Sequence, residues 1–145
     1  MSNIWLPLLL AIAFLTSRCD TQHTPRLEGN WYYCEFWDGE SPNYTECYFV
    51  NDSTLIINDI TFGWTTNYYE HKADSLIFRT YMNPYPWIIK SYSDSIIELS
   101  IDSIEIVMKQ IEEEVDIGML RSKDIDSSNL FSEGFWRRMN KLGCP

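Results

Sequence analysis

The sequence predicts an all-β protein: an antiparallel up-and-down meander of about eight short strands that closes into a small barrel, with one short helix near the C-terminal end. Four Asp-Ser pairs are each followed within two residues by a run of branched aliphatic residues. Hydrophobic alternation also recurs in short segments with short connections, which join only antiparallel neighbours. The four pairs are Asp52-Ser53, Asp74-Ser75, Asp94-Ser95 and Asp102-Ser103.

The expected strands cover about residues 28–37, 44–50, 54–58, 64–71, 75–80, 86–92, 96–101 and 104–111. Asp and Ser side chains bond their own backbone and hold tight turns, and the aliphatic runs that follow favour a pleated, half-buried surface. Eight such strands are enough to close a barrel without exposed edges. An open, curled sheet is the alternative.

An apolar run over residues 4–15, interrupted only by Pro7, has the length of the hydrophobic part of an export signal and is too short to span a bilayer. The residues Leu15-Thr16-Ser17-Arg18-Cys19 resemble the lipobox of bacterial lipoproteins, which implies that Cys19 carries a lipid anchor. Residues 1–18 are then the export signal and residues 19–26 a polar tether. The protein is expected in the bacterial cell envelope, anchored to a membrane. An ordinary cleaved signal with an incidental cysteine is the alternative.

Export lets cysteines pair, because the receiving compartment is oxidising. Cys34 and Cys47 flank a strong turn cluster at residues 38–43. If the hairpin is symmetric about that cluster, residues whose numbers sum to 81 face each other, and a Cys34–Cys47 disulfide is expected. Such a bridge is worth on the order of 3 kcal/mol in the chain-entropy model. Two buried free thiols are the alternative, and Cys144 is either unpaired or displaces one of the two.

The segment Leu27-Glu28-Gly29-Asn30-Trp31 resembles the Gly-x-Trp opening of lipocalins, and in particular the small bacterial lipocalin-like lipoproteins. The likeness covers residues 27–111. It implies a barrel in which Trp31 points inward near the closed end, with a small-molecule cavity at the other end.

An inward Trp31 assigns the faces of the first hairpin, because side chains alternate along a strand. Tyr33, Glu35, Glu46 and Tyr48 then join it in the interior, with Glu35 directly opposite Glu46. Two facing carboxylates walled by aromatic rings would suit a cation or a sugar. The opposite face is more apolar and competes for the interior, and a one-residue slip undoes both assignments. That face carries Tyr32, Cys34, Phe36, Thr45, Cys47 and Phe49.

A second set of candidate ligand-binding residues comes from the aromatic middle strands and the loop at residues 81–86. Packing in the core or on the strand surface is the competing explanation for them. The set comprises Trp64, Tyr68, Tyr69, Tyr81, Tyr85 and Trp87.

Residues 112–145 are expected to form an acidic connector and a helix packed on the barrel. Residues up to Asn129 are interpreted as loop, and Ser132 is expected to cap a helix that begins at Glu133 and stops before Gly143. Its apolar face is expected to lie across one end of the barrel. The alternative is that Phe135 and Trp136, with nearby cations, dock a partner or an anionic lipid headgroup.

Eleven Lys and Arg residues against 21 Asp and Glu residues give a net charge of −10, which argues against a nucleic-acid partner. The chain lacks zinc-ligand spacing, a Gly-rich phosphate loop and a catalytic pairing, so neither an enzyme nor a cofactor or metal is expected. Two hypotheses remain. One is an anchored, non-catalytic lipoprotein that binds a small ligand; the other is an envelope protein-interaction module, such as an inhibitor or immunity-type protein, with an acidic surface.

Overall fold

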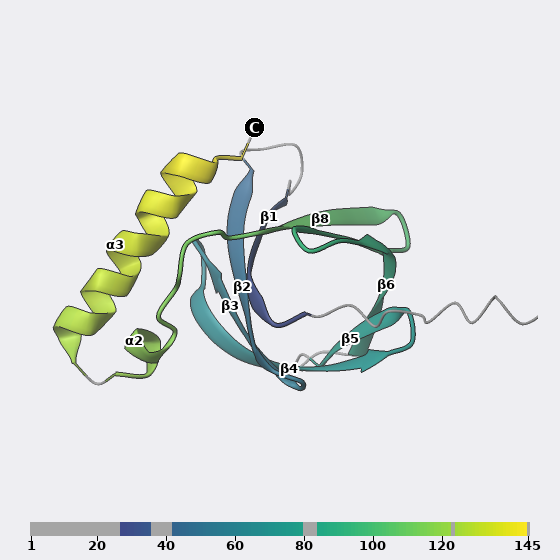
Figure 1. Cartoon of the computed structure of the whole chain (residues 1–145), viewed down its shortest axis with the longest axis horizontal. Helices are drawn as coiled ribbons and strands as arrows, with labels where there is room; N and C mark the ends of the chain where they lie inside the picture. Colours follow the sequence, from purple (N-terminus) through teal and green to yellow (C-terminus); the bar gives the residue numbers. More distant parts are fainter. Residues whose placement is uncertain (1–26, 36–41, 80–83, 123, 145) are drawn as a thin grey trace, which may run out of the picture.

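Eight antiparallel strands follow one another in chain order around a closed barrel, and β1 pairs with β8 to complete it (Figure 1). The computed structural model describes residues 27–35, 42–79, 84–122 and 124–144. The predicted fold class is therefore confirmed, and closure removes free strand edges. The strands are β1 Gly29–Glu35, β2 Asn43–Asn51, β3 Thr54–Asp59, β4 Gly63–Lys72, β5 Ser75–Arg79, β6 Pro84–Tyr92, β7 Ile96–Ile101 and β8 Ile104–Gln110.

Several expectations fall outside the part of the chain that the structure describes. These are the export signal, Cys19 and the tether, together with Phe36, Tyr81 and the side chain of Tyr85. The four Asp-Ser pairs that precede aliphatic runs lie at the hairpin turns that were predicted for them.

The barrel interior is filled by an apolar core that includes Trp31. The indole Nε1 of Trp31 donates a hydrogen bond to the carbonyl oxygen of Leu27 at 3.1 Å, and Gln110 of β8 lies opposite it. Gly29 has a φ of +132°, a conformation that residues with a side chain rarely adopt, which explains the glycine of the Gly-x-Trp segment. The core comprises Leu27, Trp31, Cys47, Phe49, Leu55, Tyr69, Leu76, Ile97, Leu99, Ile106 and Met108.

A second apolar cluster lies outside the barrel, where the helix α3, Ile125–Leu142, packs along the outer wall of β1, β2 and β3 (Figure 1). The expectation that the helix covers one end of the barrel is therefore wrong. A short helix, α2 Gly118–Arg121, precedes it. Within the described residues, neither helix is long and apolar enough to cross a membrane. The cluster comprises Tyr32, Tyr44, Tyr48, Ile56, Ile111, Val115, Leu120, Phe131 and Phe135.

The helix α3 begins two turns earlier than predicted. Asp124, not Ser132, is its N-cap, and the Asp124 side chain accepts hydrogen bonds from the backbone N–H groups of Asp126 and Ser127. The first turns expose Ile125 and Leu130, so they carry no amphipathic pattern that would predict a helix. The predicted end is correct, because the helix stops at Leu142, directly before Gly143.

The register of the first hairpin differs from the symmetric one. Trp31 faces Cys47 and Tyr32 faces Glu46, so opposed residue numbers sum to 78 rather than 81. Because the difference is odd, β2 presents the opposite face to the interior. Trp31, Tyr33 and Glu35 do point inward, but Glu46 and Tyr48 point outward beneath α3, and the expected Glu35–Glu46 pair does not form.

The disulfide joins Cys34 to Cys144, so the predicted Cys34–Cys47 pairing is wrong. With the observed register Cys34 lies opposite Tyr44, on the outer wall, where Cys144 reaches it from the second position after the end of α3. Cys47 points into the barrel as a buried free thiol. The bridge fastens the end of α3 to the barrel across 110 residues of sequence.

Candidate functional site

A recess of about 510 Å³ opens at the end of the barrel where β1 stops and β2 begins. We call it the mouth recess. It lies at the end of β1 away from Trp31, and its lining comes from β1, β2, β3 and the turn between β3 and β4. The lining residues are Tyr33, Glu35, Pro42, Asn43, Thr45, Ile57, Asp59, Ile60, Thr61 and Phe62.

Strand register places the polar lining residues in two rows. Tyr33, Thr45 and Asp59 are aligned across β1, β2 and β3, and they share the inward face. Glu35 and Asn43 form the next row toward the opening. Two carboxylates, a phenol, a hydroxyl and a carboxamide therefore converge on one recess, although they come from three different strands.

The turn between β3 and β4 shapes the rim of the mouth recess. The Asp59 Oδ1 atom accepts hydrogen bonds from the backbone N–H groups of Thr61 and Phe62, both at 2.7 Å. This arrangement is a tight side-chain-to-backbone turn. It holds the Phe62 ring at the rim, where 81% of the residue is exposed.

The electrostatics of the mouth recess keep Tyr33 neutral. Burial raises the pKa of Tyr33 well above its usual value, the neighbouring Cys47 and Glu35 raise it further, and a hydrogen bond with Thr45 opposes them only in part. Asn43 contributes a different feature, because its Oδ1 atom is buried and has no hydrogen-bond partner among the described residues. A buried acceptor without a partner is uncommon and costs free energy unless a ligand or water satisfies it.

Glu46, a predicted pocket residue, is instead the centre of a buried network beneath α3. Its Oε1 atom accepts hydrogen bonds from the Tyr44 hydroxyl at 2.7 Å and from Arg138 Nε at 2.8 Å. Its Oε2 atom accepts from Arg138 Nη2 at 2.9 Å and from the Tyr48 hydroxyl. The side chains of Glu46 and Arg138 are 0% and 5% exposed. The network fastens the helix to the barrel wall and offers no room to a ligand.

The charge pattern of this network is consistent with a fixed ion pair. Burial lowers the pKa of Arg138, but hydrogen bonds to Glu46 and the charge of Glu46 more than reverse that effect, so the guanidinium stays charged. Burial and the Glu46 carboxylate raise the pKa values of Tyr44 and Tyr48 far above the usual range. At the surface end, hydrogen bonds from Arg137 and Arg138 lower the pKa of Glu113.

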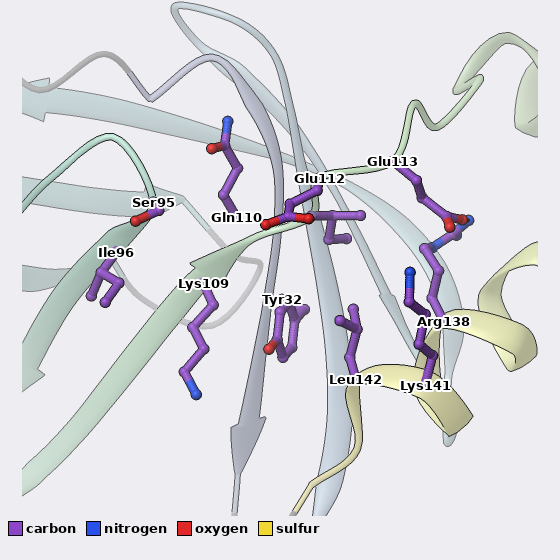
Figure 2. Close-up of a pocket in the computed structure, with 11 residues that line it drawn as sticks. Tyr32, Ser95, Ile96, Lys109, Gln110, Glu112, Glu113, Arg138, Lys141 and Leu142 are labelled. Carbon is purple, nitrogen blue, oxygen red and sulfur yellow. The ribbon is translucent and has the colours of Figure 1, made fainter.

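A second hollow, of about 350 Å³, runs between the C-terminal half of α3 and the β8 edge (Figure 2). Arg138 forms one wall and is already neutralised by Glu46 and Glu113. Figure 2 shows the side chains of Lys109 and Lys141 extending in different directions, so their ammonium groups do not converge on one anion. The mouth recess is therefore the stronger candidate site.

The structure separates the predicted ligand-binding residues into three groups. Trp31, Tyr33, Glu35 and Trp87 lie in the barrel interior, and of these Tyr33 and Glu35 reach the mouth recess. Glu46 and Tyr48 lie beneath α3. Trp64 and Tyr68 are 48% and 59% exposed, and the strand pairing places them on the outer wall.

Sequence reasoning missed Asn43, Thr45 and Asp59 in the mouth recess and Arg138 beneath the helix. The three recess residues carry no local signal, since only the correct register of β1, β2 and β3 brings them together. Arg138 does carry one, because it continues the stripe of Phe131 and Phe135 at helical spacing. An arginine on an apolar stripe predicts a buried acidic partner.

Within the described ranges, no group of three or more His, Cys, Asp or Glu side chains is placed to hold a metal ion. The chain matches no protein-family model, no characterised protein and no solved structure.

Proposed function

We propose that this protein is an exported, non-catalytic binding protein whose barrel holds a small ligand in the mouth recess. The observation that carries the proposal is the recess itself. Its volume of about 510 Å³ falls within the range of roughly 300–1,000 Å³ that small-molecule sites occupy. Its lining combines apolar side chains with a few convergent polar groups, as such sites do.

Hollows open at both ends of the barrel, the mouth recess at one end and a hollow of about 440 Å³ beside Trp31 at the other. The interior behind the recess is filled by the apolar core, with Trp31 near the opposite end. A ligand would therefore enter at the mouth and rest against Tyr33 and Ile57 without crossing the core.

Export and anchoring remain part of the proposal. The Cys34–Cys144 disulfide supports an oxidising compartment, because such bridges are rare in reducing ones. Lipidation at Cys19 would then hold the barrel at a membrane of the bacterial envelope. Intact-mass measurement on protein from native membranes tests this step: a mature N-terminus at Cys19 with added acyl mass supports the anchor, and an unmodified N-terminus elsewhere refutes it.

A fragment screen tests ligand binding at the mouth recess. We expect fragments that bind in the recess to shift the amide resonances of Tyr33, Thr45 and Asp59 in ¹H–¹⁵N NMR spectra. The variant Thr45→Phe fills the recess and should abolish these shifts. Thr66→Phe, which makes the same change on the exposed outer face of β4, should leave them intact. Fragments that bind both variants equally, or no fragment at the mouth, would refute the proposal.

A second candidate function is a protein-interaction module. It is favoured by the apolar rim, where Ile60, Phe62 and Trp64 are 45%, 81% and 48% exposed, on a chain with a net charge of −10. Such a surface would meet a basic partner. Phe62→Ser separates the two functions, since it should abolish partner binding while the recess still accepts a fragment that lies against Tyr33.

A further inference from the structure

We infer that the Cys34–Cys144 disulfide is a redox-sensitive clasp on the seam between β1 and β8. In the oxidised protein the clasp holds the last turn of α3 against the barrel wall and keeps the seam closed. Reduction by a dithiol releases both, while the remainder of the fold stays in place. The clasp does not depend on ligand binding, so it can be refuted while the proposed function holds.

The seam between β1 and β8 has the shortest strand pairing in the barrel. β1 pairs with β2 along its whole length, but with β8 only at Trp31 and Tyr32. Next to these pairs, the Ile111 N–H donates a hydrogen bond across the seam to the Asn30 carbonyl oxygen at 2.8 Å. The pairing therefore ends two residues before Cys34, on the side away from the mouth. A seam held at one end opens more readily than its neighbours, because local opening costs least where few backbone hydrogen bonds break.

The disulfide fastens the part of β1 that lies beyond this pairing. Cys34 lies on the outer wall, and Cys144 reaches it from the second position after α3. Tyr32 and Lys109, which form one of the two seam pairs, line the hollow of about 350 Å³ together with Leu142 of the last helical turn (Figure 2). Because the chain runs from β8 through the connector into α3, the bridge closes a covalent ring across the seam.

The body of α3 has an attachment of its own, which confines the effect of reduction to the last turn. Phe131, Phe135 and Arg138 are buried, and Arg138 is paired with Glu46 of the barrel wall. The helix residues after Arg138 are half-buried or exposed. Loss of the bridge should therefore fray the last turn and leave the earlier turns docked.

The bridge is placed where a reductant can reach it, since both of its cysteines are only partly buried, in contrast to the buried thiol of Cys47. A thiolate of the dithiol attacks the Cys144 sulfur, and the Cys34–Cys144 bond breaks. Cys34 leaves as a thiolate and takes up a proton. The second thiol of the reductant then displaces Cys144 from the mixed disulfide. The dithiol is oxidised to a disulfide, and its two electrons and two protons reduce the bridge to two thiols.

The position of Cys34 also links the clasp to the mouth recess. Its two neighbours in β1, Tyr33 and Glu35, line that recess. Movement of this end of β1 therefore changes the shape of the recess. This consequence, unlike the clasp itself, rests on the proposed function.

Amide hydrogen exchange, followed by NMR on the full-length protein with and without dithiothreitol, tests the clasp. Gly143 reports on the last turn, because its N–H bonds to a helix carbonyl oxygen at 2.9 Å, and Ile111 reports on the seam. Tyr69 and Ile89 donate backbone hydrogen bonds at hairpin turns away from the seam. Since a cross-link restricts the opened chain, reduction should raise the exchange rates of Gly143 and Ile111 about ten-fold or more beyond any rise at Tyr69 and Ile89.

Matched variants and labelling of the native protein separate release of the clasp from unfolding. Cys144→Ser should reproduce the reduced pattern without reductant. Cys47→Ser makes the same change outside the bridge and should keep both the oxidised pattern and its response to dithiothreitol. Alkylation of the reduced, folded protein should modify Cys34 and Cys144 and spare the buried Cys47.

Three results would overturn the clasp. Equal acceleration at all four amides, or labelling of Cys47 together with the other two cysteines, would make the bridge a stabiliser of the whole fold and no switch. Acceleration at Gly143 without Ile111 would show a fraying helix and an unaffected seam. A bridge that dithiothreitol reduces only after denaturation would show that the folded protein does not respond to a dithiol. Fragment binding at the mouth recess is measured on the oxidised protein and is independent of all three.

Discussion

The buried pair formed by Glu46 and Arg138 yields the sharpest prediction for stability. Arg138→Met removes both guanidinium hydrogen bonds from a carboxylate that is fully buried. The two tyrosine hydroxyls that remain cannot neutralise the charge. Breaking one partner of a buried ion pair costs about 3–5 kcal/mol of unfolding free energy, and we expect a loss in that range. Glu46→Met should also be destabilising, because the buried Arg138 guanidinium then keeps only Glu113 as a charged partner.

The double variant is the informative one. If the two losses were independent they would sum to about 6–10 kcal/mol. Because Glu46 and Arg138 neutralise each other's charge, removing both in the double variant leaves no buried unpaired charge. It loses only the acceptor of Tyr44 and Tyr48, at roughly 1–3 kcal/mol for each hydroxyl. We therefore expect a coupling free energy of about 2–3 kcal/mol or more.

Urea unfolding at pH 7, with the disulfide intact, measures all four corners of this cycle. Tryptophan fluorescence follows the barrel, and far-UV circular dichroism follows α3. Additive losses, with a coupling free energy below about 0.5 kcal/mol, would show that the pair does not join the helix to the barrel and would refute the reasoning. Lys72→Met is the control, since Lys72 pairs with Glu70 at the surface, away from this network.

Three further predictions concern the disulfide, the buried tyrosines and the helix cap. Cys144→Ser should destabilise the oxidised protein by up to about 5 kcal/mol in the chain-entropy model but not the reduced protein, measured by thermal unfolding with and without reductant; Cys47→Ser should have the same effect in both. Folding raises the pKa values of the buried Tyr33, Tyr44 and Tyr48, so the stabilisation that these residues provide is complete below about pH 10 and is lost as pH rises further. Absorbance at alkaline pH should show their phenolates forming only with unfolding. The Asp124 carboxylate has a lowered pKa because of hydrogen bonds from Ser127 and Asp126. Asp124→Asn, which keeps a capping oxygen but not the charge, should therefore lower the melting temperature at neutral pH, and this loss relative to the wild type should vanish as pH falls through that lowered pKa. Asp124→Ala, which also removes the capping oxygen, should lower it more and keep part of its loss at low pH.

The strands were predictable because their signals are local. Turn chemistry at the Asp-Ser pairs and alternation over five to ten residues depend only on neighbouring positions. The lipocalin resemblance implied an inward Trp31, although side-chain alternation left the opposite face as a competitor, and the structure places Trp31 in the barrel core. The start of α3 was not predictable from periodicity, since the first turns of the helix are exposed and their cap is a single aspartate.

The register of the first hairpin was beyond the reach of the sequence, and β2 shows why. Six consecutive residues of β2, from Tyr44 to Phe49, are buried, one face by the barrel core and the other by α3. When both faces of a strand are buried, hydrophobic alternation no longer tells the inner face from the outer one. The predicted interior position of Glu46 failed for this reason.

The chain alone therefore determined approximately where each strand begins and ends, because this depends on turn chemistry and side-chain alternation within short segments. Only the tertiary structure decided which face of β2 lines the barrel. That choice brought Thr45 and Asp59 to the mouth recess, placed Glu46 against Arg138, and gave Cys34 its partner near the other end of the chain. The physical reason is that pairing between strands and packing of the helix join residues far apart in sequence, and no local pattern records those contacts.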